Sequence, residues 1–409
     1  MKINLTILFL LVAFFTNAQY KIEGKVIDSV SQKPLSDINI FLSHTTNGTS
    51  SNNKGEFQLS NLKQEKYELV VSSLNYEETI IPISVINNTE PFLIKLKPTA
   101  NILKEVVVEP YDKNGWDEWG EQFKSYFIGS TQLAKYCKLL NPEVIKFRFN
   151  SKTNKLHAFT NKMLVFENKR LGYRIRYVLS KFEIDFTYHT FSFKGYPLFE
   201  ELKPNNSKEA NRWNQLRNET YKGSIRHFIR SLYYDNLEKD GFEITQVRMI
   251  TDEEKNRVHE LAKAIQKKVD ADGGEKFQIE KDSLEYYNKV NSLPLEENRL
   301  LLNNVVPRDR IIFSSGLIDS TYKNLYFEGS LQVLYKNKKI PYEYAKTLPL
   351  YRSSEYIKTD ISLRNNKPIS IYQNGNYYNG LDLLTDGYWA WSEKLANLMP
   401  SNYMISGKQ

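Results

Sequence analysis

The chain has 409 residues, of which 41% are hydrophobic and 25% are charged. This ordinary globular composition excludes collagen-like, coiled-coil and fully disordered proteins. The single cysteine, Cys137, cannot close an intramolecular disulfide, so packing must stabilise the fold. The formal net charge is +8, and aromatic residues make up 13% of the chain, the least ordinary number in the composition.

Residues 1–18 have the layout of a secretory signal peptide. Lys2 gives a positive start, residues 3–15 are almost wholly apolar, and small residues precede Gln19 at the expected cleavage site. The apolar stretch is too short to cross a bilayer core of about 30 Å, and no later stretch is long and apolar enough. Gln19 rather than a cysteine follows the cut, so no lipid anchor is expected. The sequence therefore predicts export, with no transmembrane segment in the mature chain.

Residues 20–98 alternate between apolar and polar side chains in short runs, and many of the apolar residues are β-branched or aromatic. Turn-forming pairs such as Lys33-Pro34 and Asn47-Gly48 separate these runs. A period of two over short runs predicts β-strands. About seven such strands predict an all-β sandwich with Greek-key connections over residues 19–108.

Several sequence blocks follow one another in this region in a fixed order: Gly24–Asp28, Lys33–Leu35, Ile38–Ile40, Thr45–Ser50, Gly55–Leu59 and Tyr67–Ser72. Together they resemble the carboxypeptidase regulatory-like domain, a transthyretin-like β-sandwich of Gram-negative bacteria. The resemblance implies a structural or docking module. It implies no peptidase activity, because the catalytic zinc domain of that family is a separate unit.

Residues 109–409 mix two periodicities and predict a larger α+β domain. Apolar residues three and four apart predict helices at 116–140, interrupted at Gly129, and at 208–238. Alternating runs predict strands, at 145–149, 156–159, 164–167, 173–179, 182–193, 325–335, 360–363 and 369–372.

The end of the chain adds a hairpin and a helix to this prediction. Asn374-Gly375 is a hairpin-turn pair, and residues 385–398 are typical of a short closing helix. The periodicity changes near residues 98–115, where we expect the boundary between the two domains.

Residues 251–300 differ from the rest of this domain, because 21 of these 50 residues are charged. A narrow apolar stripe comprises Val258, Leu261, Ile265 and Val269 and ends at Gly273-Gly274. Such a pattern predicts a charged helical insertion whose polar face meets solvent.

A second resemblance covers much of residues 116–400. It is carried by several blocks, Phe127–Thr131, Leu140–Glu143, Leu171–Tyr173, Tyr221–Ser224 with His227-Phe228, and Asp386–Trp389. These blocks resemble an uncharacterised domain that accompanies the regulatory-like module in exported proteins of Gram-negative bacteria. The resemblance implies a cell-envelope location, in the periplasm or at the outer-membrane surface, and no particular activity.

No catalytic motif is recognisable in the sequence. The five histidines form no zinc-peptidase pattern, and the glycines form neither a serine-hydrolase elbow nor a phosphate-binding loop. Ser224 and His227 lie one helical turn apart, and adjacent acids such as Glu200-Glu201 occur. These leave an envelope hydrolase of unrecognised type as an alternative, while we predict no catalytic residues, no metal site and no cofactor.

The positive net charge would suit nucleic-acid binding, but the predicted export argues against such a partner. The densest basic group comprises Lys169, Arg170, Arg174 and Arg176. It is read as a strand face, with a patch for anionic glycans or lipid head groups as the alternative.

The aromatic excess is the best remaining functional signal. Aromatic residues crowd between positions 372 and 391, interleaved with asparagines, and flat rings beside amides suit a sugar or a peptide. Packing within strands and around a Gly-containing turn is the alternative for these residues, and it is the favoured one. The sequence predicts a non-catalytic envelope protein that binds a partner protein or a glycan, and the candidate ligand-binding residues are Tyr372, Tyr377, Tyr378, Trp389 and Trp391.

Overall fold

A computed structural model describes residues 20–85, 90–99, 111–271, 281–293, 299–314, 322–348, 355–378 and 380–404. The predicted signal peptide lies outside the described residues. The chain forms two compact units: unit 1 comprises residues 1–226, 372–376 and 391–409, and unit 2 comprises residues 227–371 and 377–390.

The expected boundary near residues 98–115 falls inside unit 1, whereas the border between the units falls after Arg226. The domain bounds 19–108 and 109–409 stay a prediction.

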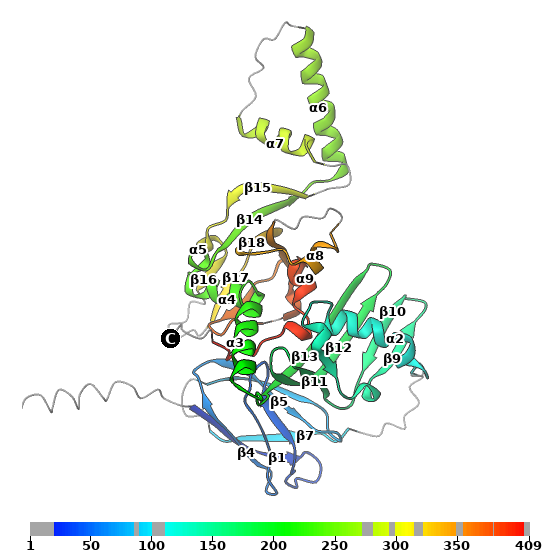
Figure 1. Ribbon diagram of the computed structural model, residues 1–409, viewed down its shortest axis with the longest axis vertical. Helices are drawn as coiled ribbons and strands as arrows, with labels where there is room; N and C mark the ends of the chain where they lie inside the picture. The colour runs from blue at the N-terminus through cyan, green and yellow to red at the C-terminus, as the bar shows by residue number, and fades with distance from the viewer. Residues whose placement is uncertain are drawn as a thin grey trace, which may run out of the picture. The chain divides into compact units, whose positions relative to one another are not determined.

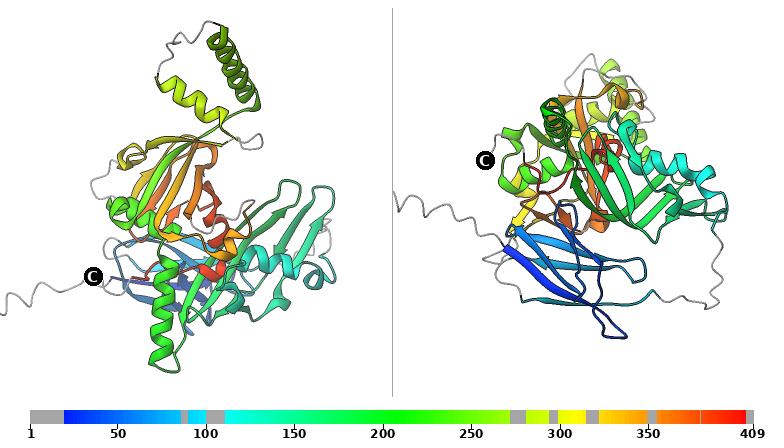
Figure 2. Two further views of the ribbon diagram at one scale, coloured as in Figure 1. Left: turned by 45° about the horizontal axis from the view of Figure 1, so that its top comes forward. Right: turned by 60° about the horizontal axis from the view of Figure 1, so that its bottom comes forward.

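The first part of unit 1 is a seven-stranded β-sandwich, drawn in blue in Figures 1 and 2. One sheet has the order β4-β1-β7 and the other has the order β3-β2-β5-β6, so the predicted β-rich N-terminal region is confirmed. The strands are β1 (Tyr20–Asp28), β2 (Asn39–Leu42), β3 (Gly48–Ser50), β4 (Glu56–Leu62), β5 (Lys66–Ser72), β6 (Thr79–Ser84) and β7 (Phe92–Leu96).

Alternation along these strands builds the core of the sandwich. Ile22 and Val26 of β1 face Leu59 of β4 and Leu69 of β5, and all four side chains are buried. The polar residues between them point outward. The period of two therefore fixes both the strands and the face that each strand buries.

The second part of unit 1 is a curved six-stranded sheet that is followed by helix α3. The strand order is β8-β11-β12-β10-β9, and β13 pairs with β12 along its whole length. The elements are α2 (Gly115–Phe123), η2 (Lys124–Ile128), η3 (Ala134–Tyr136), β8 (Cys137–Leu139), η4 (Pro142–Val144), β9 (Lys146–Asn150), β10 (Lys155–Phe159), β11 (Leu164–Asn168), β12 (Tyr173–Asp185), β13 (Thr190–Glu201), α3 (Ser207–Tyr221) and, near the C-terminus, η8 (Leu395–Asn397).

Aromatic rings fill the inner face of this sheet. Phe127 is fully buried, and its ring lies 5.0 Å from the Phe123 ring and 5.0 Å from the Tyr177 ring, between centroids. Phe166 and Phe182 complete the centre of the cluster. Much of the aromatic excess in the composition is therefore core packing, in which each large ring buries a large apolar area.

The sandwich packs against the outer face of the β12–β13 hairpin. Phe41 and Val70 of the sandwich form a small apolar cluster with Val178 and Tyr196. Backbone hydrogen bonds join the two parts, from the His44 N–H to the Pro197 carbonyl at 2.8 Å and from the Phe199 N–H to the Thr45 carbonyl at 2.9 Å. The sandwich thus supports the sheet through both apolar contact and backbone pairing.

Helix α3 docks on the sheet through Trp213 and Arg217. Gly172 has a positive φ of 66°, and a Cβ at this position would lie 2.3 Å from the Trp213 ring. Only glycine allows this approach. The buried Arg217 guanidinium donates to the Leu171 carbonyl at 2.7 Å and lies 4.0 Å from the Tyr173 ring centroid.

Unit 2 contains a five-stranded sheet of order β15-β14-β18-β19-β22 and a four-stranded sheet of order β16-β17-β20-β21. Its elements, some of which cross a unit border, are α4 (Ile225–Tyr234), α5 (Leu237–Asp240), β14 (Phe242–Met249), α6 (Asp252–Ala271), α7 (Lys281–Asn291), β15 (Arg299–Val305), η5 (Arg308–Arg310), β16 (Ile312–Ser314), β17 (Tyr322–Leu325), β18 (Ser330–Lys339), α8 (Tyr342–Ala345), β19 (Tyr356–Leu363), η6 (Arg364–Asn366), β20 (Ile369–Tyr372), β21 (Tyr377–Tyr378), η7 (Gly380–Asp382), β22 (Leu383–Gly387) and α9 (Tyr388–Ser392).

The charged segment 251–300 lies between the paired strands β14 and β15. Its described part contains α6 and α7, and Figure 1 shows α6 extending away from these two strands. Val258 and Val290 pack with Ile250 and Leu300 at the base. Apart from Lys255, the other side chains of residues 252–267 are exposed or half-buried, as the high density of charge in this segment predicts.

Two helix predictions were wrong in part. Residues 131–140 form a single 3-10 turn followed by strand β8, because Cys137–Leu139 pair with Phe166–Asn168 and this tertiary pairing outweighs the apolar spacing. Residues 385–398 form the end of β22, the short helix α9 and a 3-10 turn. The turn at Asn374-Gly375 is confirmed, since the Tyr372 N–H donates to the Asn376 carbonyl at 2.9 Å.

No helix in the described part of the chain is both long enough and apolar enough to cross a membrane.

Candidate functional site

The five predicted ligand-binding residues fall in both units. Tyr372 and Trp391 belong to unit 1, and Tyr377, Tyr378 and Trp389 belong to unit 2. Trp389 is 2% exposed and packs 5.3 Å from the Phe228 ring, and Tyr372 is 5% exposed. Tyr372 and Trp389 are therefore buried, whereas Tyr377, Tyr378 and Trp391 are half-buried, and ligand binding by these five residues stays a prediction.

The basic group on β11 and β12 is engaged by neighbouring side chains. Arg174 pairs with Glu167 at 3.2 Å and Arg176 pairs with Glu200, while Arg170 lies 4.0 Å from the Tyr136 ring centroid. These contacts fit the interpretation of a structural strand face.

The hydrolase alternative rested on Ser224 and His227. Ser224 precedes helix α4, and the imidazole of the buried His227 has its Nε2 3.6 Å from the Asp240 carboxylate. Ser231 has its Oγ 2.7 Å from the same carboxylate and 2.9 Å from the His227 carbonyl oxygen. The Ser231 hydroxyl is thus bound by these acceptors, and His227 lies in the same network through Asp240. Hydrolysis through Ser224 stays an alternative prediction.

Within the described ranges, no group of three or more His, Cys, Asp or Glu residues is arranged to hold a metal ion.

A different surface combines exposed rings with charge, on the outer face of strands β9, β10 and β12. The inner positions of these strands are buried, and the alternate positions point outward. We call the outward residues, together with Tyr111 and the neighbouring β13 lysine, the outer grid: Tyr111, Lys146, Arg148, Lys155, His157, Phe159, Lys181, Glu183, Asp185 and Lys194.

Strand register places these side chains in rows. Arg148 lies opposite His157, and His157 lies opposite Glu183, which makes one row across three strands. Lys155 lies opposite Asp185, and Lys146 lies opposite Phe159. Side chains directly opposite each other on one face of a sheet are close enough to act on one ligand.

Arg148 packs against a pair of neighbouring aromatic rings. Its guanidinium carbon lies 5.0 Å from the Tyr111 ring centroid and 5.2 Å from the Phe159 ring centroid. The two rings, 5.8 Å apart, remain 46% and 38% exposed as residues. Among the described residues no carboxylate pairs with this guanidinium, unlike those of Arg174 and Arg176, and its Nε atom is buried without a hydrogen-bond acceptor.

Asp112 fixes the position of Tyr111. One of its carboxylate oxygens accepts hydrogen bonds from the Trp119 indole N–H at 2.9 Å and from the Phe149 N–H at 3.2 Å. Its own N–H donates to the Phe147 carbonyl at 2.9 Å. The segment that carries the Tyr111 ring is therefore tied to β9, the strand that carries Arg148.

The carboxylates of the outer grid are paired within it. Asp185 accepts from the N–H groups of Thr187 and Tyr188 and lies 3.2 Å from the Lys155 Nζ. Against the opposing cost of burial, these hydrogen bonds keep the pKa of Asp185 below its usual value. Glu183 lies 3.3 Å from Lys155 and 3.7 Å from Lys181.

His157 sits at the centre of the grid. Its Nδ1 lies 3.8 Å from Glu183, and its ring lies 6.2 Å from the Phe159 ring. Burial lowers the pKa of His157, nearby cations lower it further, and Glu183 partly opposes them. The imidazole is therefore neutral near pH 7, with a donor and an acceptor for a hydroxyl group.

The sequence did contain a signal for this surface. Outward positions of a strand that faces solvent are normally polar, yet Phe159 occupies one, between the inward Ala158 and the turn that follows. What the sequence could not provide is the register that brings Phe159 and Arg148 together with Tyr111.

Comparison with known proteins identifies the N-terminal part. The family model of the CarboxypepD_reg-like domain matches residues 22–108. This match agrees with the resemblance found in the sequence and with the seven-stranded sandwich. No curated protein sequence matches the chain.

Among solved structures, one match is described as "a putative carbohydrate binding protein from Bacteroides uniformis". It has a TM-score of 0.17 and 12% sequence identity, and it covers 44% of this chain and 78% of that chain. A likeness this weak does not bear on the fold or the ligand of the present chain.

Proposed function

We propose that this chain is an exported cell-envelope protein with a binding role, and that the outer grid is its ligand surface. The observation that carries the proposal is the Arg148 guanidinium, packed against the exposed rings of Tyr111 and Phe159 with no carboxylate partner among the described residues. The CarboxypepD_reg-like sandwich supports the sheet that displays this surface.

A carbohydrate is the ligand class that this surface suits best. The flat faces of Tyr111 and Phe159 can stack on the apolar face of a sugar ring. His157, Glu183 and the lysines around them can donate to and accept from hydroxyl groups. Exposed rings can orient a ligand by stacking, and the polar groups beside them can fix its register.

Removing the rings should weaken glycan binding. We expect Phe159→Ala and Tyr111→Ala each to lower the affinity for a bound oligosaccharide about tenfold, because each loses a stacking face. Titration calorimetry with the full chain, after a screen of neutral and acidic glycans, measures this change.

Tyr136→Ala is the matched control, since it removes a ring of similar exposure, 45%, that also stacks on an arginine. Its affinity should equal that of the wild type. Silence of the whole glycan screen, or equal losses in all three variants, would contradict a sugar site on the outer grid.

The cellular location rests on the signal-peptide pattern and the resemblances. A Gram-negative cell that produces the full chain should yield a protein that begins at Gln19, in the periplasmic or outer-membrane fraction. Cell fractionation with N-terminal sequencing tests this, and an uncleaved chain recovered from the cytosol would refute export.

A further inference from the structure

The outer grid has more cations than carboxylates, and both of its carboxylates already have partners. The grid holds the cations Lys146, Arg148, Lys155, Lys181 and Lys194 against two carboxylates. Both carboxylates are already bound, Glu183 by Lys155 and Lys181, and Asp185 by Lys155 and two backbone N–H groups. The surface therefore keeps a net positive charge after its internal pairs are counted.

Two cations outside these internal pairs, Lys146 and Arg148, lie beside the exposed rings. Lys146 lies opposite Phe159 on the neighbouring strand, and Arg148 lies against both rings. Lys181 lies opposite Lys194 in the β12–β13 pair. With strands about 4.8 Å apart, the four strands extend over roughly 15 Å, so several sugar units could span the row.

The chemistry of Arg148 selects the type of anion. A guanidinium presents its donors as a planar fork that matches a carboxylate in two parallel hydrogen bonds. Contact with the rings of Tyr111 and Phe159 restricts the Arg148 side chain, so less side-chain freedom is lost on binding. A sugar whose ring stacks on Phe159 could place a carboxylate at the fork.

We infer that the outer grid binds an acidic polysaccharide, through pyranose stacking on Tyr111 and Phe159 and a uronate carboxylate at Arg148. This inference rests on the proposed function and adds the class of its ligand. Nucleic acids and anionic membranes suit the surface less well, because Glu183 and Asp185 interrupt the positive charge where those partners would need it continuous.

Two ligands that differ only in charge provide the test. Hexagalacturonate carries one carboxylate on every sugar, and its methyl ester has the same sugars without the charge. Titration calorimetry of the full chain should show the acid binding at least about tenfold more tightly than the ester in low salt. Added salt should reduce this difference, since part of the attraction is between charges.

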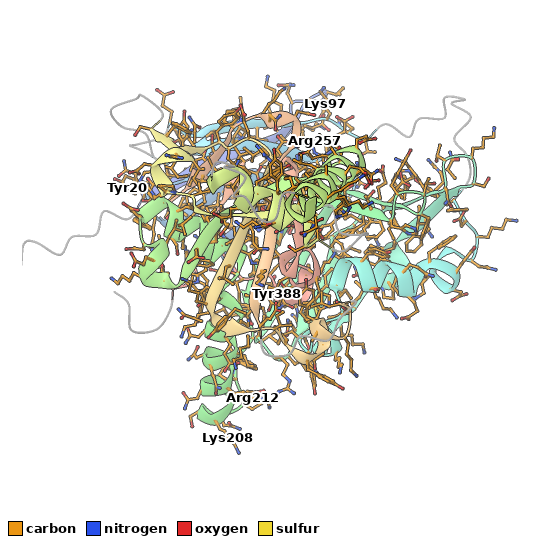
Figure 3. All side chains as sticks on the ribbon, turned by 90° about the horizontal axis from the view of Figure 1, so that it is seen from above. Tyr20, Lys97, Lys208, Arg212, Arg257 and Tyr388 are labelled. Atoms are coloured by element: carbon orange, nitrogen blue, oxygen red, sulfur yellow. The ribbon has the colours of Figure 1, made fainter. Side chains whose placement is uncertain are left out.

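Arg148→Gln should bind the acid and the ester with nearly equal affinity, because the fork is lost while both rings remain. Arg212→Gln is the matched control. Arg212 is an exposed residue of α3 that projects away from the helix in Figure 3, and its replacement should leave the preference for the acid intact. Circular dichroism confirms that each variant is folded.

The outcomes separate the inference from the proposed function. If the ester binds as tightly as the acid, the carboxylate inference is wrong and the sugar site stands. If neither ligand nor any glycan in the screen binds, both fail. If single-stranded DNA or vesicles of anionic lipid bind to the same residues as tightly as hexagalacturonate, the surface is a general polyanion site and the inference is overturned.

Discussion

Replacing Phe127 with alanine should lower the free energy of unfolding of unit 1 by about 3–5 kcal/mol. The ring is fully buried and contacts the rings of Phe123, Phe166 and Tyr177. Its removal leaves a cavity at the centre of the aromatic core, and strands held by their own hydrogen bonds can close around it only in part.

Urea denaturation followed by tryptophan fluorescence measures this loss, because four of the five tryptophans belong to unit 1. Phe159→Ala is the comparison, since its ring is 38% exposed and should cost less than about 1 kcal/mol. Similar losses in the two variants would show that the division of the aromatic residues into core and surface is wrong.

Replacing Lys394 with methionine should stabilise unit 1 near neutral pH. Lys394 is only 6% exposed, and its Nζ lies 3.2 Å from the centroid of the Phe191 ring. Burial lowers the pKa of this ammonium group to about 7. Holding a proton here is therefore costly, and a methionine of similar length avoids that cost while it loses a cation–π contact.

The direction in which stability changes with pH follows from the protonation of Lys394 in the folded and the unfolded chain. Between pH 7 and 9.5 the unfolded chain holds a proton on Lys394 that the folded chain releases, so the stability of the wild type rises with pH. At about 1.4 kcal/mol per pH unit, the rise attributable to this group is about 3 kcal/mol over the window.

The methionine variant should lack that rise and should exceed the wild type by about 2–3 kcal/mol at pH 7. Urea denaturation at several pH values measures both effects. Lys208→Met, at an exposed position of α3 (Figure 3), should follow the wild-type curve. A wild-type curve parallel to that of Lys394→Met would mean that the ammonium is solvated.

The sandwich and the strands of the curved sheet could be predicted because their pattern is local. In β1, Ile22 and Val26 alternate with polar residues, and one periodicity determines both the strand and its buried face. The helix expected at 131–140 failed because Leu133, Tyr136 and Leu140 have helical spacing, while the pairing of Cys137–Leu139 with β11 is a non-local interaction.

The sequence indicated the type of candidate residue, an aromatic side chain, but not where in the fold such residues are exposed. The aromatic excess directed attention to rings, but sequence alone cannot separate a buried ring such as Trp389 from an exposed one such as Phe159. Arg148 becomes notable only through register and the return of Tyr111 to β9, both of which depend on tertiary structure.

Gly129 is a second case in which a contact between distant residues cannot be read from the sequence. Its place in the sequence suggested a break between two helices, and a positive φ of 102° does end η2 there. The structure adds that a Cβ at this position would lie 2.8 Å from the Cβ of Lys394, more than 250 residues later in the chain. A glycine required by such a distant contact cannot be told from a turn glycine in the sequence.

The central claim is that the open face of β9, β10 and β12 is the ligand surface. It is tested most directly by the side-chain Nε–H signal of Arg148 in a nuclear magnetic resonance titration with hexagalacturonate, assigned by its absence in Arg148→Gln. We expect this signal to shift in a saturable manner while the Arg212 signal does not move. If the ligand binds and the Arg148 signal stays unchanged, the ligand lies elsewhere and the outer grid is not its site.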